Sequence, residues 1–224
     1  VFLGTTAAAP WLLQLFPALG HDCTNGTWEE HCVRSFSFGH GSAIVATGTG
    51  DRGAIFAAYE LSHALLGVSP IWFWSGREPA YLGSVTVALP LNLSFSRPDY
   101  KYRALFPNDE DLLAGHFADP GGKNIISVEA WSRFCETALR LKANTIQVGT
   151  VSYPDEDVVA VAARRGLVLT ASHFNLVGSN TFRWPLELSA LPNQGWDWRK
   201  DPQSMAHLWK ASIDVQKGSE VLWS

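Results

Sequence analysis

The stretch KYRALFPNDEDLL (residues 101–113) runs from an apolar segment straight into a group of acids. Residues 102–106 predict a short buried strand, which ends at Pro107. The residues that follow are polar: Asn108, Asp109, Glu110 and Asp111. Such a run is either a solvated loop or the rim of a functional site. The fold decides between the two, because parallel α/β folds carry functional groups on loops after the carboxyl ends of strands.

Strands and helices alternate in the sequence after this stretch. Apolar residues at helical spacing predict the helices, and short apolar runs predict the strands. Acids near Pro154 and arginines before Gly166 suit the dipole of the helix between them. The expected elements, in order, are a helix over 127–143, a strand over 144–150, a helix over 154–165, a strand over 167–172, a helix over 202–217 and a strand from 220.

Repeated strand–helix units imply a parallel sheet, either an open sheet or a (β/α)8 TIM barrel. A barrel takes about 250 residues, and the alternating part of this chain covers only residues 100–224. If the sheet is a barrel, we expect these residues to be its first half, a fragment that stops inside the fourth strand.

Residues 1–99 predict a separate small α/β domain, which we expect to be incomplete at its start because Val1 already lies in an apolar run. The stretch GTGDRG (48–53) matches no phosphate-binding glycine motif, so we interpret it as a tight turn from strand to helix. The expected elements are a strand over 1–5, a helix near 11–16, a strand over 42–48, a helix over 52–67 and a β-rich connector.

Composition excludes several kinds of partner. The net charge of −4 gives no basic surface for nucleic acid. No apolar run reaches the roughly 18 residues of a membrane helix, so we expect no membrane partner. His31 beside Cys32 lacks the paired ligands of a zinc site, so we expect no metal. Ten Trp residues favour carbohydrate, because sugar rings stack on exposed indoles.

Cysteines and glycosylation motifs favour a secreted, extracellular protein. Cys23 and Cys32 are expected to lie in one polar loop and to form a disulfide, with Cys135 as a buried thiol. Asn25 and Asn92 each begin an N-x-Ser/Thr acceptor motif for N-glycosylation.

Three loops after predicted strands hold the candidate site residues. An acidic run is a solvated loop in most sequences, and a single histidine is more often structural than catalytic. Their positions after strand ends favour the functional interpretation. The candidates are Asn108, Asp109 and Glu110 after the first strand, Thr150, Ser152 and Tyr153 after the second, and Ser172, His173, Phe174 and Asn175 after the third.

Several motifs resemble those of one enzyme family, glycoside hydrolase family 115, the xylan α-glucuronidases. RGAIFAAYELSHALLGVSPIWFW (52–74) resembles the family segment RGTIYGxYxLSExxGVSPWYWW, and YKYRALFPNDED (100–111) resembles VKYRGIFxNDE. LRLKANTIQV (139–148) is similar to LRLKANYLWP, GLVLTASHF (166–174) to the region of GIVMGTSHHEPM, and GWDW (195–198) to WDY. The motifs occur in the family's order and span nearly the whole chain.

The resemblance implies a small N-terminal α/β domain followed by a (β/α)8 catalytic barrel. It implies inverting hydrolysis of glucuronic acid or 4-O-methylglucuronic acid side groups from xylan, a step in hemicellulose degradation. Such a mechanism uses a carboxylic acid and a carboxylate about 6.5–9.5 Å apart. No cofactor is expected, the partner is a polysaccharide or oligosaccharide, and a homodimer through regions downstream is expected.

Site residues follow from the resemblance position by position. Asn108, Asp109 and Glu110 match the NDE of the substrate pocket, and Asp109 and Glu110 are the candidates for catalysis within this chain. His173 matches the first His of SHHEP, and Asn175, which stands at the Glu position, is a further candidate for substrate binding. The family's proposed acid and base lie on later strands, beyond Ser224, so we expect the 224-residue chain alone to be inactive.

The chain departs from the family pattern where strands end. Phe174 replaces the second His of SHHEP and Leu176 replaces its Pro, while Gln147 stands at the Trp of YLWP. These differences leave two alternatives open. One is a non-catalytic relative that binds acidic polysaccharide, and the other is a hydrolase of the same fold that acts on another glycan.

Overall fold

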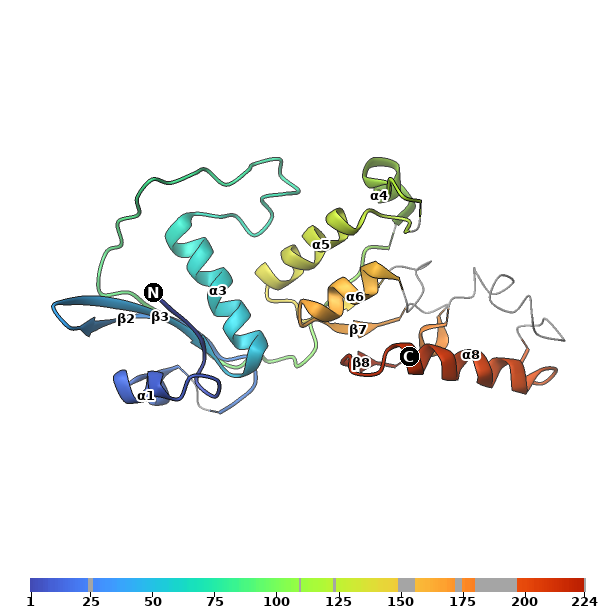
Figure 1. The fold of residues 1–224 in the computed structure, drawn as a ribbon, viewed down its shortest axis with the longest axis horizontal. Helices are drawn as coiled ribbons and strands as arrows, with labels where there is room; N and C mark the ends of the chain where they lie inside the picture. The colour runs from blue at the N-terminus through green and yellow to red at the C-terminus, as the bar shows by residue number, and fades with distance from the viewer. Residues whose placement is uncertain are drawn as a thin grey trace. The chain divides into compact units, whose positions relative to one another are not determined.

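The chain divides into two compact units in the computed structural model (Figure 1). The N-terminal unit comprises Val1–Lys101 with Leu139–Lys142, and the C-terminal unit comprises Tyr102–Ala138 with Ala143–Ser224. The structure describes residues 1–23, 26–108, 110–122, 124–148, 156–171, 175–179 and 197–223.

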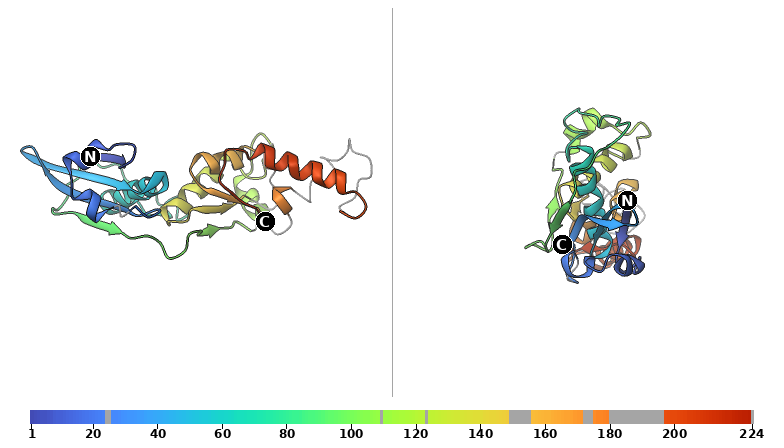
Figure 2. Two further views of the ribbon diagram at one scale, coloured as in Figure 1. Left: turned by 90° about the horizontal axis from the view of Figure 1, so that it is seen from below. Right: turned by 90° about the vertical axis from the view of Figure 1, so that its left-hand side faces the viewer.

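The N-terminal unit is built on a mixed four-stranded sheet with the order β1-β3-β2-β4. β1 runs parallel to β3, whereas β2 pairs antiparallel with both β3 and β4. Figure 2 shows β4 as the green arrow beside the blue strands. Its elements are β1 (Phe2–Thr5), α1 (Trp11–Leu15), α2 (Leu19–Asp22), β2 (His31–Phe38), β3 (Gly41–Gly48), α3 (Gly50–Leu66) and β4 (Asn92–Phe95).

Helices cover this sheet on both faces. Leu12, Phe16 and Leu19 of the α1–α2 segment pack with Cys32 and Val45 on one face. A second cluster on the α3 side is formed by Val33, Ala46 and Ala57, with Leu61, Leu91 and Leu93 packed against it. Figure 1 shows α1 and α3 on opposite sides of β2 and β3. The unit therefore has three layers, with an apolar core on each side of the sheet.

The prediction that both cysteines lie in one loop is wrong, because residues 31–38 form the strand β2. Cys32 lies inside β2 and is fully buried, and a disulfide joins it to Cys23 at the end of α2. We predicted a loop because Cys and Gly are frequent there. The alternation from His31 to Phe38, followed by a two-residue connection that starts with Gly39 at φ 58°, is instead typical of a β-hairpin.

The glycines of residues 48–53 form the close contact between β3 and α3. A Cβ atom at Gly48 would lie 2.2 Å from the backbone carbon of Gly53, and a Cβ at Gly53 would lie 2.8 Å from the carbonyl oxygen of Glu30. Both glycines therefore allow backbones to approach more closely than a side chain permits. The prediction of a tight strand-to-helix turn is confirmed, with Thr49 as the residue before the helix.

The C-terminal unit contains a four-stranded parallel sheet with the order β5-β6-β7-β8, which is also the order along the chain. Helices precede or follow each strand, as the alternating sequence predicts. Its elements are β5 (Ala104–Leu105), α4 (Glu110–Phe117), α5 (Val128–Arg140), β6 (Thr145–Gln147), α6 (Asp157–Arg164), β7 (Val168–Thr170), η1 (Leu176–Gly178), α8 (Pro202–Val215) and β8 (Val221–Leu222).

The predicted elements of this unit are present but shorter. The helix predicted over 127–143 is α5, and its backbone begins after Ser127, whose Oγ accepts a hydrogen bond from the Ala130 N–H at 3.3 Å. The helix predicted from Pro154 begins at Asp157, and Pro154 itself lies outside the described residues. Cys135 is buried in α5 as predicted, and burial raises the pKa of its thiol to about 12.

Two predictions at the first strand of this sheet are wrong. The buried strand expected over 102–106 is reduced to Ala104 and Leu105, with Ala104 and Phe106 exposed. Among the described strands β5 pairs only with β6, which makes it an edge strand. The expected loop after Pro107 is also wrong in part, because Glu110 is the first residue of α4.

Asn144 fixes the start of the parallel sheet. Its Oδ1 accepts hydrogen bonds from the backbone N–H of Arg103 and from Oγ1 of Thr145, both at 2.9 Å. Its backbone N–H donates to the carbonyl oxygen of Arg103 at 3.0 Å, and its own carbonyl accepts from the N–H of Val168 at 2.8 Å. The buried side chain of Asn144 thus ties the segment before β5 to the start of β6, and its backbone carbonyl adds the link to β7.

None of the helices in the described ranges is both long and apolar enough to cross a lipid bilayer.

We expect Gly48→Ala to lower the free energy of unfolding by about 3 kcal/mol or more, because the new methyl group would overlap the backbone of Gly53. Gly41→Ala in the same strand is the matched control. Its Cβ would meet nothing within 4 Å, so its effect should stay within about 0.5 kcal/mol. Urea unfolding of the two variants measures both values. Equal stability of the two would contradict a close backbone contact at Gly48.

Candidate functional site

The candidate site lies at the carboxyl edge of the parallel sheet. Because β5, β6, β7 and β8 all run in the same direction, their carboxyl ends share one edge, where the connecting loops begin. Asn108 follows β5, Val148 follows β6, Ala171 and Asn175 follow β7, and Trp223 follows β8. This edge is where parallel α/β folds bind ligands.

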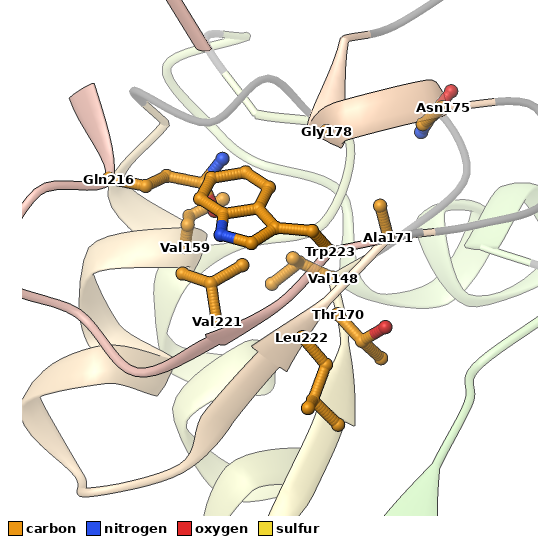
Figure 3. A pocket seen from close by; sticks show the side chains of 10 residues that line it. All are labelled: Val148, Val159, Thr170, Ala171, Asn175, Gly178, Gln216, Val221, Leu222 and Trp223. Carbon is orange, nitrogen blue, oxygen red and sulfur yellow. The ribbon is translucent and has the colours of Figure 1, made fainter. Parts of the chain in front are cut away.

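Strand register divides the side chains at this edge between two faces. Gln147 is paired with Thr170, and Thr170 with Leu222, so these three side chains share one face. Figure 3 shows Val221 and Trp223 on one side of β8 and Leu222 on the other. Val159 of α6 lies on the side of Val221, so the face with Gln147 is the one that α6 does not cover.

Gln147 is the polar residue of this face whose environment is most unusual. Its side chain is only 8% exposed, and its Nε2 has no hydrogen-bond partner in the part of the chain that the structure describes. Leaving a buried N–H unpaired costs about 1–3 kcal/mol. Asn144, three residues earlier, is buried to a similar degree and has both of its Oδ1 contacts filled. Within the described residues, the amide N–H of Gln147 thus lacks an acceptor.

A pocket at the carboxyl ends of β6, β7 and β8 is lined from both faces of the sheet and has about 360 Å³ of empty space, open solvent included. Half of its lining residues are aliphatic, so it resembles a gap in the packing of the sheet against α6 more than a sugar subsite. Asn175 reaches its rim, is 2% exposed, and accepts a hydrogen bond at its backbone carbonyl from the N–H of Gly178. The residues that line it are Val148, Val159, Thr170, Ala171, Asn175, Gly178, Gln216, Val221, Leu222 and Trp223.

The structure places some of the predicted site residues and leaves others untested. Asn108 is exposed in the segment between β5 and α4 and does not line the pocket. Asn175 lies at the ends of β6, β7 and β8, where the third loop was predicted to contribute. Glu110 begins α4, but its side chain is not described. Asp109 and His173 lie outside the described residues, so their roles stay predictions.

Three residues at this edge were missed by the search for polar loops. The sequence showed Gln147 only as a departure from a family motif, and Thr170 and Trp223 were not considered. In the structure Gln147 and Thr170 are the last residues of β6 and β7, and Trp223 directly follows β8. The strands predicted over 144–150 and 167–172 run past Gln147 and Thr170, so the strand-end rule was applied to residues further along the chain.

Among the described residues, no three side chains of His, Cys, Asp or Glu come close enough together to hold a metal ion.

Comparison with solved structures finds a related fold. BtGH115A, described as a family GH115 4-O-methyl-alpha-glucuronidase with specificity for decorated arabinogalactans, superposes with a TM-score of 0.77 at 21% sequence identity. The match covers 99% of this chain and 29% of that chain, so the chain spans less than a third of that relative. At this identity the likeness shows a shared fold. A search of curated proteins finds no significant match.

A family comparison is more specific. The sequence model of glycosyl hydrolase family 115 matches residues 96–224, which include the whole parallel sheet and more than half of the chain. The motifs that resembled this family at residues 100–111, 139–148 and 166–174 all fall inside the matched region. The chain therefore belongs to glycosyl hydrolase family 115.

Proposed function

We propose that the chain forms part of an α-glucuronidase-like glycoside hydrolase. Its substrate would be a polysaccharide of the xylan type that carries glucuronic acid or 4-O-methylglucuronic acid side groups. Membership of the family supports a carbohydrate substrate. The observation that carries the proposal is the buried amide of Gln147 at the carboxyl edge of the sheet. Its N–H has no partner in the described part of the chain and suits a hydroxyl or carboxylate oxygen of a sugar.

The parallel sheet supports a barrel. We infer that β5, β6, β7 and β8 are the first four strands of a (β/α)8 barrel, since they pair in chain order and alternate with helices. In a closed barrel, the face that α6 leaves uncovered would be the inner face, so Gln147 and Thr170 would point toward the substrate-binding end.

Hydrolysis with inversion needs two carboxyl groups. One protonates the departing glycosidic oxygen, and the other removes a proton from the attacking water on the opposite side of the sugar. We assign Asp109 and Glu110 to the rim of the substrate pocket, with substrate positioning as their role. The acid and base are assigned to strands that follow β8.

A second candidate substrate has specific support. BtGH115A, which shares the fold, is described as specific for decorated arabinogalactans. Its described activity removes the same kind of acidic sugar from a different polysaccharide. Gln147 and Asn175 differ from the family motif in the segments that would contact the sugar. The polysaccharide backbone of the substrate is therefore the part most expected to differ from xylan.

Sugar release distinguishes these possibilities. The longest protein that contains this chain is incubated with glucuronoxylan, with a neutral arabinoxylan and with glucuronic acid-decorated arabinogalactan. We expect release of the acidic sugar from glucuronoxylan and none from arabinoxylan. Release only from arabinogalactan would assign the second substrate. Binding of both acidic polysaccharides without release would favour a non-catalytic binding protein.

Substitutions in the acidic run test the substrate-positioning role. We expect Asp109→Asn and Glu110→Gln each to lower kcat/KM about a hundredfold or more, because misplacing the substrate by about 1 Å has that effect. Unfolding free energies should change by less than about 0.5 kcal/mol. Asp111→Asn, the next carboxylate in the run, is the matched control and should keep its activity. If activity and stability fell together, the acidic run would be interpreted as a solvated loop and not as part of the substrate pocket.

Gln147 offers a test that separates binding from folding. We expect Gln147→Leu to leave the free energy of unfolding unchanged or raised, because it removes a buried N–H that has no partner among the described residues. The same variant should weaken binding of free glucuronic acid about tenfold or more, since a hydrogen bond to a charged group contributes about 1.5–3 kcal/mol. Urea unfolding and isothermal titration calorimetry measure the two effects.

The control for Gln147 is Asn144→Leu. It leaves the N–H of Arg103 and the hydroxyl of Thr145 without their acceptor, so we expect it to destabilise the chain by about 3 kcal/mol. If Gln147→Leu destabilised the chain as much as Asn144→Leu, the amide of Gln147 would be structural.

A further inference from the structure

The acceptor motif Asn92-Leu93-Ser94 lies on a strand at the edge of the N-terminal sheet. Within the described residues β4 pairs only with β2, and the register places Asn92 opposite Arg34 and Ser94 opposite Cys32. Asn92 and Ser94 are both exposed. Because residues two apart in a strand share a face, both polar residues of the motif lie on one accessible surface.

The opposite side of the same strand is anchored in the core. Leu93 packs against the cluster of Val33, Ala46 and Ala57 on the α3 side of the sheet. Burial of Leu93 holds the strand in place without using the face that carries Asn92. A bulky group on Asn92 would therefore extend into solvent and leave the packing of β4 unchanged.

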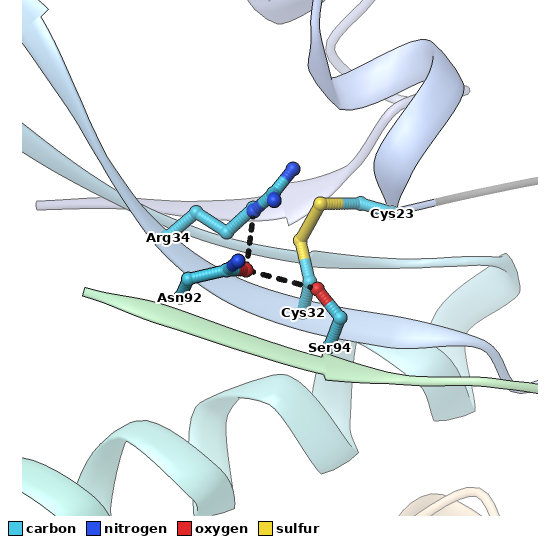
Figure 4. The surroundings of a disulfide bond; sticks show 5 residues. All are labelled: Cys23, Cys32, Arg34, Asn92 and Ser94. Atoms are coloured by element: carbon cyan, nitrogen blue, oxygen red, sulfur yellow. Dashed lines mark hydrogen bonds between the residues drawn. A yellow bond between two sulfur atoms is a disulfide. The ribbon is translucent and has the colours of Figure 1, made fainter. Parts of the chain in front are cut away.

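The amide of Asn92 uses its oxygen for internal contacts. Arg34 Nε donates to Oδ1 of Asn92 at 2.6 Å, and Oγ of Ser94 donates to the same atom at 3.2 Å (Figure 4). Arginine can only donate, so the contacted atom must be the oxygen. Neither contact uses Nδ2, the atom to which an N-linked sugar attaches.

A disulfide lies on this same face. Figure 4 shows the Cys23–Cys32 bond beside Asn92 and Ser94, and Ser94 is opposite Cys32 in the register. Disulfides persist mainly in oxidising compartments such as the secretory route. Acceptor asparagines are modified along that same route. The covalent bond and the exposed motif are independent observations that favour one compartment.

We propose that Asn92 carries an N-linked oligosaccharide and that the chain is accordingly secreted. Nδ2 of Asn92 attacks the anomeric carbon of a lipid-linked oligosaccharyl pyrophosphate. The new N–C bond forms as the C–O bond to the pyrophosphate breaks, Nδ2 loses a proton, and the lipid pyrophosphate leaves. No oxidation or reduction is involved. Oδ1 keeps its contacts with Arg34 and Ser94 after the reaction.

The position of the sugar has a structural consequence. An edge strand exposes backbone N–H and C=O groups that can pair with another chain. An oligosaccharide on Asn92 would stand beside the open edge of β4 and hinder such pairing. The glycan would therefore reduce self-association of the N-terminal unit as well as increase solubility.

Glycopeptide mapping of the protein from its own source tests the proposal directly. After treatment with peptide N-glycosidase, residue 92 should be recovered as aspartate in the peptide that contains it. In a eukaryotic secretory host, Asn92→Gln and Ser94→Ala should both lose one glycan by intact mass. Ser94→Thr should keep it, because threonine also completes the motif.

Asn25→Gln is the matched control, since it removes the other acceptor motif and should leave the glycan on Asn92 in place. Recovery of unmodified Asn92 from the source protein would overturn the proposal, and so would a wild-type mass that differs from that of Asn92→Gln only by the one CH2 group of the substitution. If the variants failed to be secreted, the glycopeptide map of the wild-type protein would still show whether Asn92 is glycosylated. None of these outcomes bears on the hydrolase assay.

Discussion

Parallel pairing in chain order is the constraint on which the C-terminal unit depends. It requires a helical crossover between successive strands and brings every carboxyl end to one edge. Asn144 holds this arrangement at its start, because its side-chain amide connects the segment before β5 to β6 and its backbone carbonyl accepts a hydrogen bond from β7. The position of the candidate site follows from these contacts, since Gln147 is three residues beyond Asn144 on the same strand segment.

The order of elements could be predicted from local patterns, whereas pairing could not. α5 and α8 have clear apolar spacing and good first residues, so both were found within a few residues of their bounds. β2 was missed although its hairpin with β3 is local, and only its pairing with β4 depends on residues far along the chain. The exposure of β5 was missed because burial of a strand depends on what covers its faces.

The sequence predicted which candidate residues follow the strands, but not the face of the sheet on which each side chain lies. The strand-end rule selected the loops of Asn108 and Asn175 correctly as neighbours of strand ends. Whether a side chain points to the inner or the outer face depends on register, which a one-residue shift reverses. The sequence therefore does not show which way Gln147 and Val148 point. In the structure the N–H of Gln147 has no partner among the described residues, and Val148 lines the pocket.

The disulfide of the N-terminal unit also affects resistance to proteases. Cys23 and Cys32 enclose a short ring of chain, so a single cut between them would leave both fragments covalently joined. The fragment before the cut contains β1 and α1, whose side chains form much of one apolar core. A nicked molecule would keep that core intact. It would migrate as one chain under denaturing conditions until a reductant separated the two pieces.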